Sequence, residues 1–131
     1  MDKIVRSFPC PCGNGKNYSG CCSTYLDEDK FAPSAEVLMR SRYSAYVLKR
    51  EDYVLATWHP STRPEKLDLA ADTQTKWLGL DVKRHELTAP DQAIVEFVAR
   101  YKINGRAQRL HEISRFIQLD QRWYYVEGTF V

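Results

Sequence analysis

All four cysteines of this 131-residue sequence lie within residues 10–22, and this cluster constrains the fold more than any other feature. They are spaced C-x-C, then eight residues, then C-C, at Cys10, Cys12, Cys21 and Cys22. Zinc takes four such ligands in a tetrahedron at about 2.0 to 2.3 Å. Gly20, just before the adjacent pair, permits the bend that turns both of its sulfurs toward one metal. The spacing therefore predicts one zinc ion held by the four thiolates.

Two alternatives for the cysteines are a pair of disulfides and four unconnected thiols. Disulfides need an oxidising compartment. Residues 1–8 carry Asp2, Lys3 and Arg6 and contain no apolar run long enough for a secretory signal. Unconnected thiols would have no reason to gather in one short segment. No apolar stretch reaches the about eighteen residues of a membrane span, so we expect a cytoplasmic zinc protein.

The charge pattern argues against a general nucleic-acid binder. The formal charge of +2 counts the thiols as neutral, and four thiolates with one zinc bring it to zero. Lysines and arginines are interspersed with acids instead of forming a basic run. A limited RNA contact remains an alternative hypothesis, in which Lys3, Arg6 and Lys16 bind phosphates while Phe8 and Tyr18 stack on bases.

The first half of the chain after the cysteines has helical patterns. Ser34 is a good N-cap, and apolar residues at helical spacing predict a largely buried helix over 36–49. A shorter helix is expected over 52–57, and another turn or two within 67–77, ended by Gly79. The charged stretch 23–30 reads as a solvated connector.

From Leu80 onward the hydrophobic period changes to two. Asn104-Gly105 and Asp120-Gln121 are two-residue turns of the kind that join hairpins. Helices followed by strands predict an α+β fold, with the helices packed on one face of a four-stranded antiparallel sheet. The expected strands are 80–87, 93–103, 106–119 and 123–131.

The inward face of strand 106–119 is left open by its pattern, because polar and apolar residues occur on both sides. If the even positions face inward, Glu112 and Ser114 lie beneath the helices. An unpaired carboxylate there would cost too much free energy. We therefore expect Glu112 to meet Arg42, which lies in the apolar stripe of helix 36–49. The pair would be a structural ion pair or a ligand-orienting pair; two separate exposed residues are the alternative.

Aromatic residues are numerous enough to line a pocket, although we favour a plain core as their role. The candidate pocket residues are Arg42, Trp58, Tyr101, Glu112 and Ser114, with further aromatic walls from Tyr43, Tyr46, Trp77, Phe97, Phe116 and Trp123.

The three histidines do not assemble a catalytic set. His111 neighbours Glu112 in sequence and so lies on the opposite strand face. His59 is expected to cap the end of the preceding helix, with a general base as the alternative, and His85 is expected to be solvated. No catalytic residue is predicted.

Two stretches resemble known families. Residues 10–22 resemble the SEC-C motif, the zinc-binding tail of the SecA preprotein translocase. The runs 38–46, 58–63, 110–116 and 123–126 resemble the YchJ family, which joins a SEC-C knuckle to a cystatin-like, nuclear transport factor 2-like cone and has no established biochemical activity. The resemblance implies a knuckle over 1–26 and a cone domain over 30–131.

Four thiolates leave no open coordination position, which predicts a structural metal. We expect a non-enzymatic interaction module whose zinc knuckle is a recognition head for a protein partner. The SecA tail engages the chaperone SecB and the ribosome, so the similarity implies a partner of that kind. The alternative is a small-molecule binder or enzyme that uses the cavity of the cone. A homodimer through the last strand, with Phe130 and Val131, is also possible on this pattern.

Overall fold

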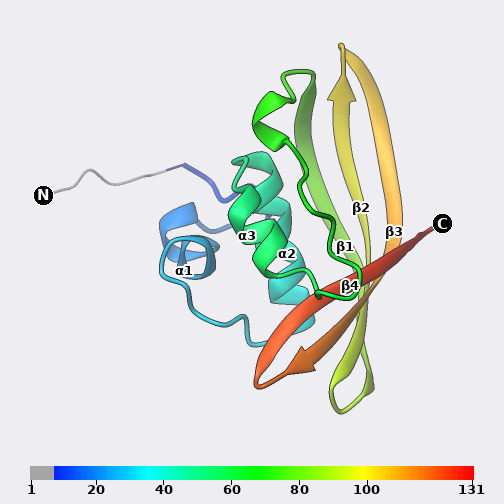
Figure 1. Ribbon diagram of the computed structural model, residues 1–131. Coiled ribbons are helices and arrows are strands. Elements are labelled where there is room, and N and C mark those ends of the chain that lie inside the picture. The colour runs from blue at the N-terminus through cyan, green and yellow to red at the C-terminus, as the bar shows by residue number, and fades with distance from the viewer. Residues whose placement is uncertain (1–7) are drawn as a thin grey trace, which may run out of the picture.

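The computed structural model describes residues 8–131 as an α+β fold (Figure 1), which confirms the predicted class. No helix in this range is long and apolar enough to cross a bilayer. The helices are α1 (Ser23–Leu26), α2 (Ala35–Val47) and α3 (Glu51–Ala56), with 3-10 turns η1 (Tyr18–Gly20) and η2 (Leu69–Ala71). The strands are β1 (Thr75–Ala89), β2 (Gln92–Ile103), β3 (Arg106–Leu119) and β4 (Arg122–Phe130).

The sheet is a simple antiparallel meander in the order β1-β2-β3-β4. The predicted turn Asn104-Gly105 joins β2 to β3, and both residues have positive φ, at 52° and 80°. Asp120 and Gln121 do the same between β3 and β4, at 49° and 69°. Two positive-φ residues match the right-handed twist of the flanking strands, so these turns set the register of the meander.

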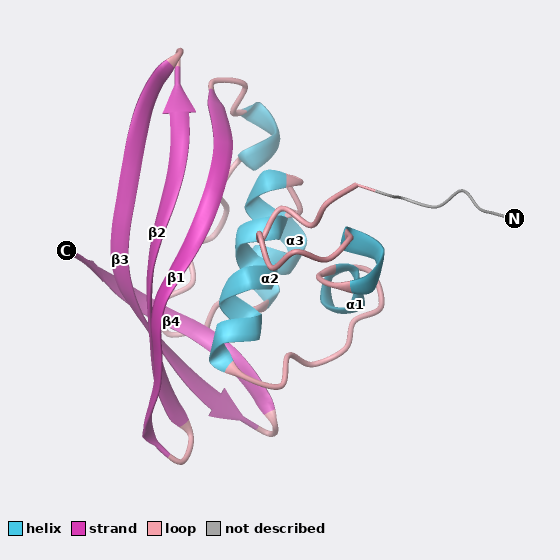
Figure 2. Ribbon diagram, turned by 180° about the vertical axis from the view of Figure 1, so that it is seen from behind, coloured by secondary structure: helices cyan, strands magenta, loops and turns pink. Residues whose placement is uncertain are grey.

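The elements form three layers. Helices α2 and α3 cover one face of the sheet, and the cysteine segment with α1 lies on the far side of α2, as the opposed views of Figures 1 and 2 agree. Helix α2 begins as predicted, because the Ser34 side chain accepts a hydrogen bond from the backbone of Val37 at 3.2 Å. It buries Leu38 and Met39 in the core. Helix α2 therefore lies between the cysteine segment and the sheet, except at Gly13, where a Cβ would lie 3.6 Å from the backbone oxygen of Leu80 in β1.

The helical turn or two expected within 67–77 is confirmed only as the single 3-10 turn η2 (Leu69–Ala71), and its expected end at Gly79 is wrong. Only η2 is helical there, and β1 begins at Thr75. The Asp72 carboxylate accepts from the backbone N–H groups of Gln74 and Thr75 at 2.9 and 3.0 Å. A short acidic side chain that bonds the backbone ahead of it favours a turn over a helix. Gly79 accordingly lies inside β1, at a register shift, and ends no helix.

The stretch 23–30 is only half the solvated connector that its charges suggested. Its first half forms α1. Residues 27–31 are exposed, but the Tyr18 hydroxyl and the Arg50 guanidinium both donate to the Asp27 carboxylate, at 2.9 and 2.7 Å. Arg50 also donates to the backbone oxygen of Leu26 at 2.9 Å. These contacts bind the end of α1 to the start of α3.

The structure also decides the orientation of β3. Its even positions point toward α2, because Leu110, Glu112, Ser114 and Phe116 all line one cavity, together with residues of α2 such as Met39. On the opposite face His111 lies 2.7 Å from the Glu96 carboxylate, which also accepts from Arg84 at 3.3 Å. The outer face at this point is a surface ion-pair network, and the inner face carries the polar groups of interest.

Candidate functional site

The four cysteine sulfurs lie within 4.8 Å of one another, and none of them forms a disulfide. The sulfurs of Cys12 and Cys21 are 3.7 Å apart, and those of Cys21 and Cys22 are 3.9 Å apart. A tetrahedron with metal–sulfur bonds of about 2.3 Å has edges of about 3.8 Å. The cluster therefore has the donor set and the spacing of a four-thiolate metal site.

A tight loop presents the sulfurs. The Cys10 backbone N–H donates to the oxygen of Lys16 at 2.8 Å, and Gly13 donates back to the oxygen of Cys10 at 3.1 Å. Gly13 adopts φ +77°, which a residue with a side chain rarely takes. The Asn14 amide donates to the Cys21 sulfur at 2.9 Å. Such a bond to a ligand sulfur tunes and orients a metal site.

Cys10 is disposed to ionise, whereas hydrogen bonds to Cys10 and burial raise the pKa of the Cys12 and Cys22 thiols. Hydrogen bonds from the Cys12 and Cys22 side chains hold the pKa of the Cys10 thiol far below its usual range, against the opposing effect of burial. Thiolates are the form that binds metals. A first thiolate is thus available at the centre of the cluster.

The cluster is packed down onto α2 and is not held away from the fold. Cys10, Cys12 and Cys22 are only 5%, 0% and 2% exposed, and they belong to the same core as Leu38. The Ser44 hydroxyl lies 3.5 Å from the Cys10 sulfur. Only Cys21 is partly exposed.

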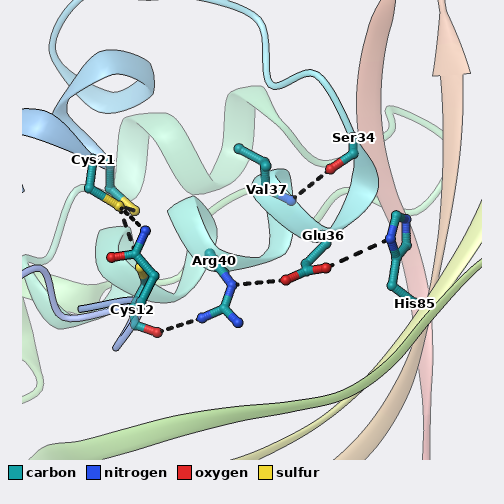
Figure 3. Close-up of polar contacts among 9 residues, drawn as sticks. Cys12, Cys21, Ser34, Glu36, Val37, Arg40 and His85 are labelled. Carbon is teal, nitrogen blue, oxygen red and sulfur yellow. Dashed lines mark hydrogen bonds and ion pairs between the residues drawn. The ribbon is translucent and has the colours of Figure 1, made fainter. Parts of the chain in front are cut away.

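A chain of polar contacts runs from this loop to the sheet (Figure 3). Arg40 donates to the backbone oxygen of Cys12 at 2.9 Å and to the Glu36 carboxylate at 3.2 Å. The other oxygen of Glu36 lies 3.8 Å from Nδ1 of His85 on β1. The expectation that His85 is solvated is therefore wrong, since its Nε2 is buried without a partner as well.

A second site is a cavity of about 240 Å³ between α2 and the inner face of the sheet. Its walls are mostly apolar or aromatic, and three polar side chains face it from α2 and β3. Thirteen residues line it: Met39, Arg42, Tyr43, Tyr46, Trp58, Trp77, Phe97, Ala99, Leu110, Glu112, Ser114, Phe116 and Tyr125.

Arg42 is buried in the wall of this cavity. Its Nη1 donates to the backbone oxygen of Val54 and to the hydroxyl of Thr57, both at 2.8 Å. The guanidinium lies over the rings of Trp58 and Tyr125, 5.1 and 4.5 Å from their centroids. Burial lowers the pKa of Arg42, because desolvation disfavours its charged form.

The expected ion pair between Arg42 and Glu112 does not form. Within residues 8–131, the Glu112 carboxylate instead accepts from the hydroxyls of Ser114 and Tyr125, the latter at 3.4 Å. Gly128 on β4 makes room for this carboxylate, since a Cβ at that position would lie 1.9 Å from its Oε2. The two charges share one cavity, but the protein bonds each of them to neutral groups.

Four of the five candidate pocket residues line the cavity: Arg42, Trp58, Glu112 and Ser114. Tyr101 does not; its ring packs against Trp77 at 5.3 Å, farther along the sheet. Sequence reasoning missed Tyr125 as a lining residue. Tyr125 lies two residues after Trp123 on β4, so the two side chains are on the same face of the strand. The alternation of β4 could therefore have predicted that Tyr125 faces inward.

The remaining candidates fall outside the cavity. Nδ1 of His59 accepts from the backbone of Ser61 at 3.0 Å, so this histidine closes the turn after α3. Lys3 and Arg6, named for RNA contact, lie outside the described residues. Tyr18 is buried and stacks on Phe8 at 5.1 Å, which leaves it unavailable as a base-stacking ring.

The fold and the sites define an α+β protein with a nuclear transport factor 2-like domain and, at its N-terminal end, a cluster of four cysteines with the spacing of a metal site. Residues 34–128 match the family model described as YchJ, middle NTF2-like domain. The chain belongs to the YchJ family.

Relatives and solved structures agree with this assignment. The chain is 58% identical over 123 residues to a UPF0225 protein of Chromobacterium violaceum, covering 91% of this chain and 90% of that protein. A UPF0225 protein of Polaromonas naphthalenivorans is 53% identical over 132 residues, covering 92% and 96%. The solution structure of a SEC-C motif containing protein from Rhodopseudomonas palustris matches with a TM-score of 0.83 at 38% identity, covering 93% and 98%. The crystal structure of a SEC-C motif containing protein from Psychrobacter arcticus matches with a TM-score of 0.79 at 31% identity, covering 98% of this chain and 86% of that chain.

Proposed function

We propose that this chain is a small-molecule-binding protein whose N-terminal segment is fastened to the fold by one structural zinc ion. The observation that carries the proposal is the cavity, in which Arg42 and Glu112 are both buried and have no charged partner among residues 8–131. Burying a charge is costly unless it is paired. Sites that bind small molecules have this composition, apolar walls with a few convergent polar groups.

The zinc assignment rests on the chemistry of the donors. Cys10, Cys12, Cys21 and Cys22 would hold the ion, and four thiolates complete its coordination. A closed site of this kind supplies folding free energy and no reactive position. Ser44 and Arg40, which contact the cluster from α2, join the metal loop to the helix that also carries the cavity. The metal therefore supports the body of the protein.

A fragment screen tests the binding proposal. Ala99, which is buried and lines the cavity, allows a blocked control: Ala99→Leu adds volume into the empty space and removes no polar group. We expect some fragments to give saturation-transfer NMR signals with the wild-type protein and not with the blocked variant. If every fragment gives the same saturation-transfer signal with the wild type and with the blocked variant, the cavity is not a binding site.

A second candidate function is recognition of a protein partner at the exposed edge of the cysteine loop. A shallow groove of about 170 Å³ beside Cys21 favours it, with Lys16 and Arg40 among its walls. A pulldown from cell lysate would compare the wild type with Lys16→Glu, which reverses the charge of one wall. A partner lost with Lys16→Glu would support this candidate, and an unchanged set of proteins would reject it. Pairing of two copies through Phe130 and Val131, which are 74% and 70% exposed, stays a prediction.

A further inference from the structure

The polar groups of the cavity have unused hydrogen-bonding atoms. Within residues 8–131, both hydrogen bonds of the Arg42 side chain start from Nη1, and both bonds to Glu112 end on Oε2. Nε and Nη2 of Arg42 therefore remain as donors, and Oε1 of Glu112 remains as an acceptor. In the described part of the chain, the fully buried side-chain atoms without a partner are His85 Nε2 and Trp123 Nε1, so the free atoms of Arg42 and Glu112 are not fully enclosed by protein. A ligand in the cavity can therefore offer them hydrogen bonds.

The charge of the cavity is already balanced. Among the lining residues that the structure describes, Arg42 and Glu112 alone carry a formal charge. A ligand with a net charge would add an unbalanced charge to a buried space, which is unfavourable. A ligand with no net charge can still serve both groups if one end carries an acceptor for Arg42 beside a donor for Glu112.

The rest of the cavity limits the body of the ligand. Apart from the polar side chains, its walls are formed by residues such as Met39, Phe97 and Leu110, which favour an apolar body. The volume of about 240 Å³ lies below the about 300 to 1,000 Å³ of sites for drug-sized molecules. The body is therefore compact, of the size of one small ring or a branched chain.

We infer that the cavity selects a compact, net-neutral molecule with an apolar body and a carboxamide-like head, whose carbonyl accepts from Arg42 and whose N–H donates to Glu112. This inference rests on the proposed function and adds the chemical class of the ligand. A carboxamide carries an acceptor for Arg42 and a donor for Glu112 on one planar group. Carboxylates, which only accept, and amidinium or ammonium ions, which only donate, satisfy one of the two groups.

Four probes of nearly equal shape test this class: benzamide, benzoate, benzamidinium and toluene. Each is titrated into isotope-labelled protein and followed by NMR shifts of residues that line the cavity. We expect the wild type to bind benzamide about tenfold more tightly than benzoate or benzamidinium, the effect of one hydrogen bond to a charged group.

Two variants make the test specific. Glu112→Gln removes the negative charge and keeps an oxygen for the Ser114 and Tyr125 hydroxyls, so the preference should move toward benzoate. Arg42→Met removes the positive charge and should move the preference toward benzamidinium. If Arg42→Met does not fold, Glu112→Gln still decides the question.

The outcomes separate the inference from the proposed function. A wild-type preference for benzoate or benzamidinium overturns the ligand class and leaves the binding function standing. If toluene binds and benzamide does not, the outcome is the same: the cavity accepts an apolar ligand, but the inferred carboxamide head of the ligand is wrong. If none of the four probes binds, both the ligand class and the binding function fall.

Discussion

The cysteine cluster and the cavity both lie against α2. They differ in which interactions of their polar groups are still missing. Arg40 and Ser44 of α2 contact the cluster, whereas Arg42 and Tyr46 line the cavity. Residues four apart share a helix face, and residues two apart do not. One helix thus serves two sites from different faces.

The difference lies in what each site still needs. The cluster gathers four sulfurs around a point where one ion would complete every contact. The cavity keeps two buried charges apart and bonds each only to neutral groups. We expect the cluster, which one ion completes, to stabilise the fold permanently. We expect the cavity, which has unused hydrogen-bonding atoms, to bind and release a small molecule.

The largest effect should come from breaking the cluster. Cys12 is fully buried among the sulfurs, and Cys12→Ser should abolish zinc binding. Structural zinc contributes on the order of 10 kcal/mol of binding free energy in small modules, so we expect a loss of several kcal/mol in unfolding free energy. Metal stoichiometry and thermal unfolding measure this. Wild type stripped by a chelator is the matched comparison, and an unchanged melting temperature in Cys12→Ser would remove the stabilising role of the metal.

The next largest loss of stability should come from filling the space beside Glu112 at the cavity. Gly128→Ala would place a Cβ 1.9 Å from Oε2 and 2.8 Å from Cγ of the buried Glu112. Overpacking of this kind costs about 1 to 3 kcal/mol, measured by denaturant unfolding. Gly79→Ala is the control, because its Cβ would meet the mobile end of the exposed Arg100 side chain, and we expect a change within about 0.5 kcal/mol. In a Glu112→Ala background the Gly128 substitution should cost less, and equal costs in both backgrounds would contradict the steric account.

A smaller effect on stability comes from two buried tyrosines, Tyr43 in α2 and Tyr53 in α3. Burial raises the pKa of Tyr43 and of Tyr53 to about 12, compared with about 10 in an unfolded chain. A raised folded-state pKa means that stability is complete below pH 10 and falls as the pH rises toward 12. Unfolding free energy measured across this window should drop more steeply for the wild type than for Tyr53→Phe. Parallel curves would show that Tyr53 ionises equally in both states.

The smallest effect is at the edge of the cluster. Asn14→Ala removes the amide bond to the Cys21 sulfur, in an exposed part of the loop. Outer contacts to metal ligands are worth about 10-fold or more in affinity, and exposure places this one at the lower end. Competition with a chromophoric chelator should show a loss of up to about 10-fold, with little change in melting temperature. Ser19→Ala, at another exposed position near the loop, is the control, and an equal loss in both variants would remove the role of the amide.

Local features were readable from the sequence because their parts are neighbours along the chain. The four cysteines lie within one short loop, so spacing and glycines alone defined the likeness to a metal site. Ser34 predicted the start of α2, and Asn104-Gly105 predicted a hairpin, since capping and turn geometry depend on a few consecutive residues. The change of period from helical to two predicted the α+β class.

Only the tertiary structure decided what depends on distant segments. Arg42 and Glu112 were expected to pair, but the C-terminal end of α3 supplies the acceptors for Arg42, and β4 supplies a hydroxyl and a glycine gap for Glu112. The start of β1 at Thr75 likewise follows from pairing with the end of β2, against a local helical pattern. Contacts between residues far apart in sequence depend on register and packing, and no local pattern contains that information.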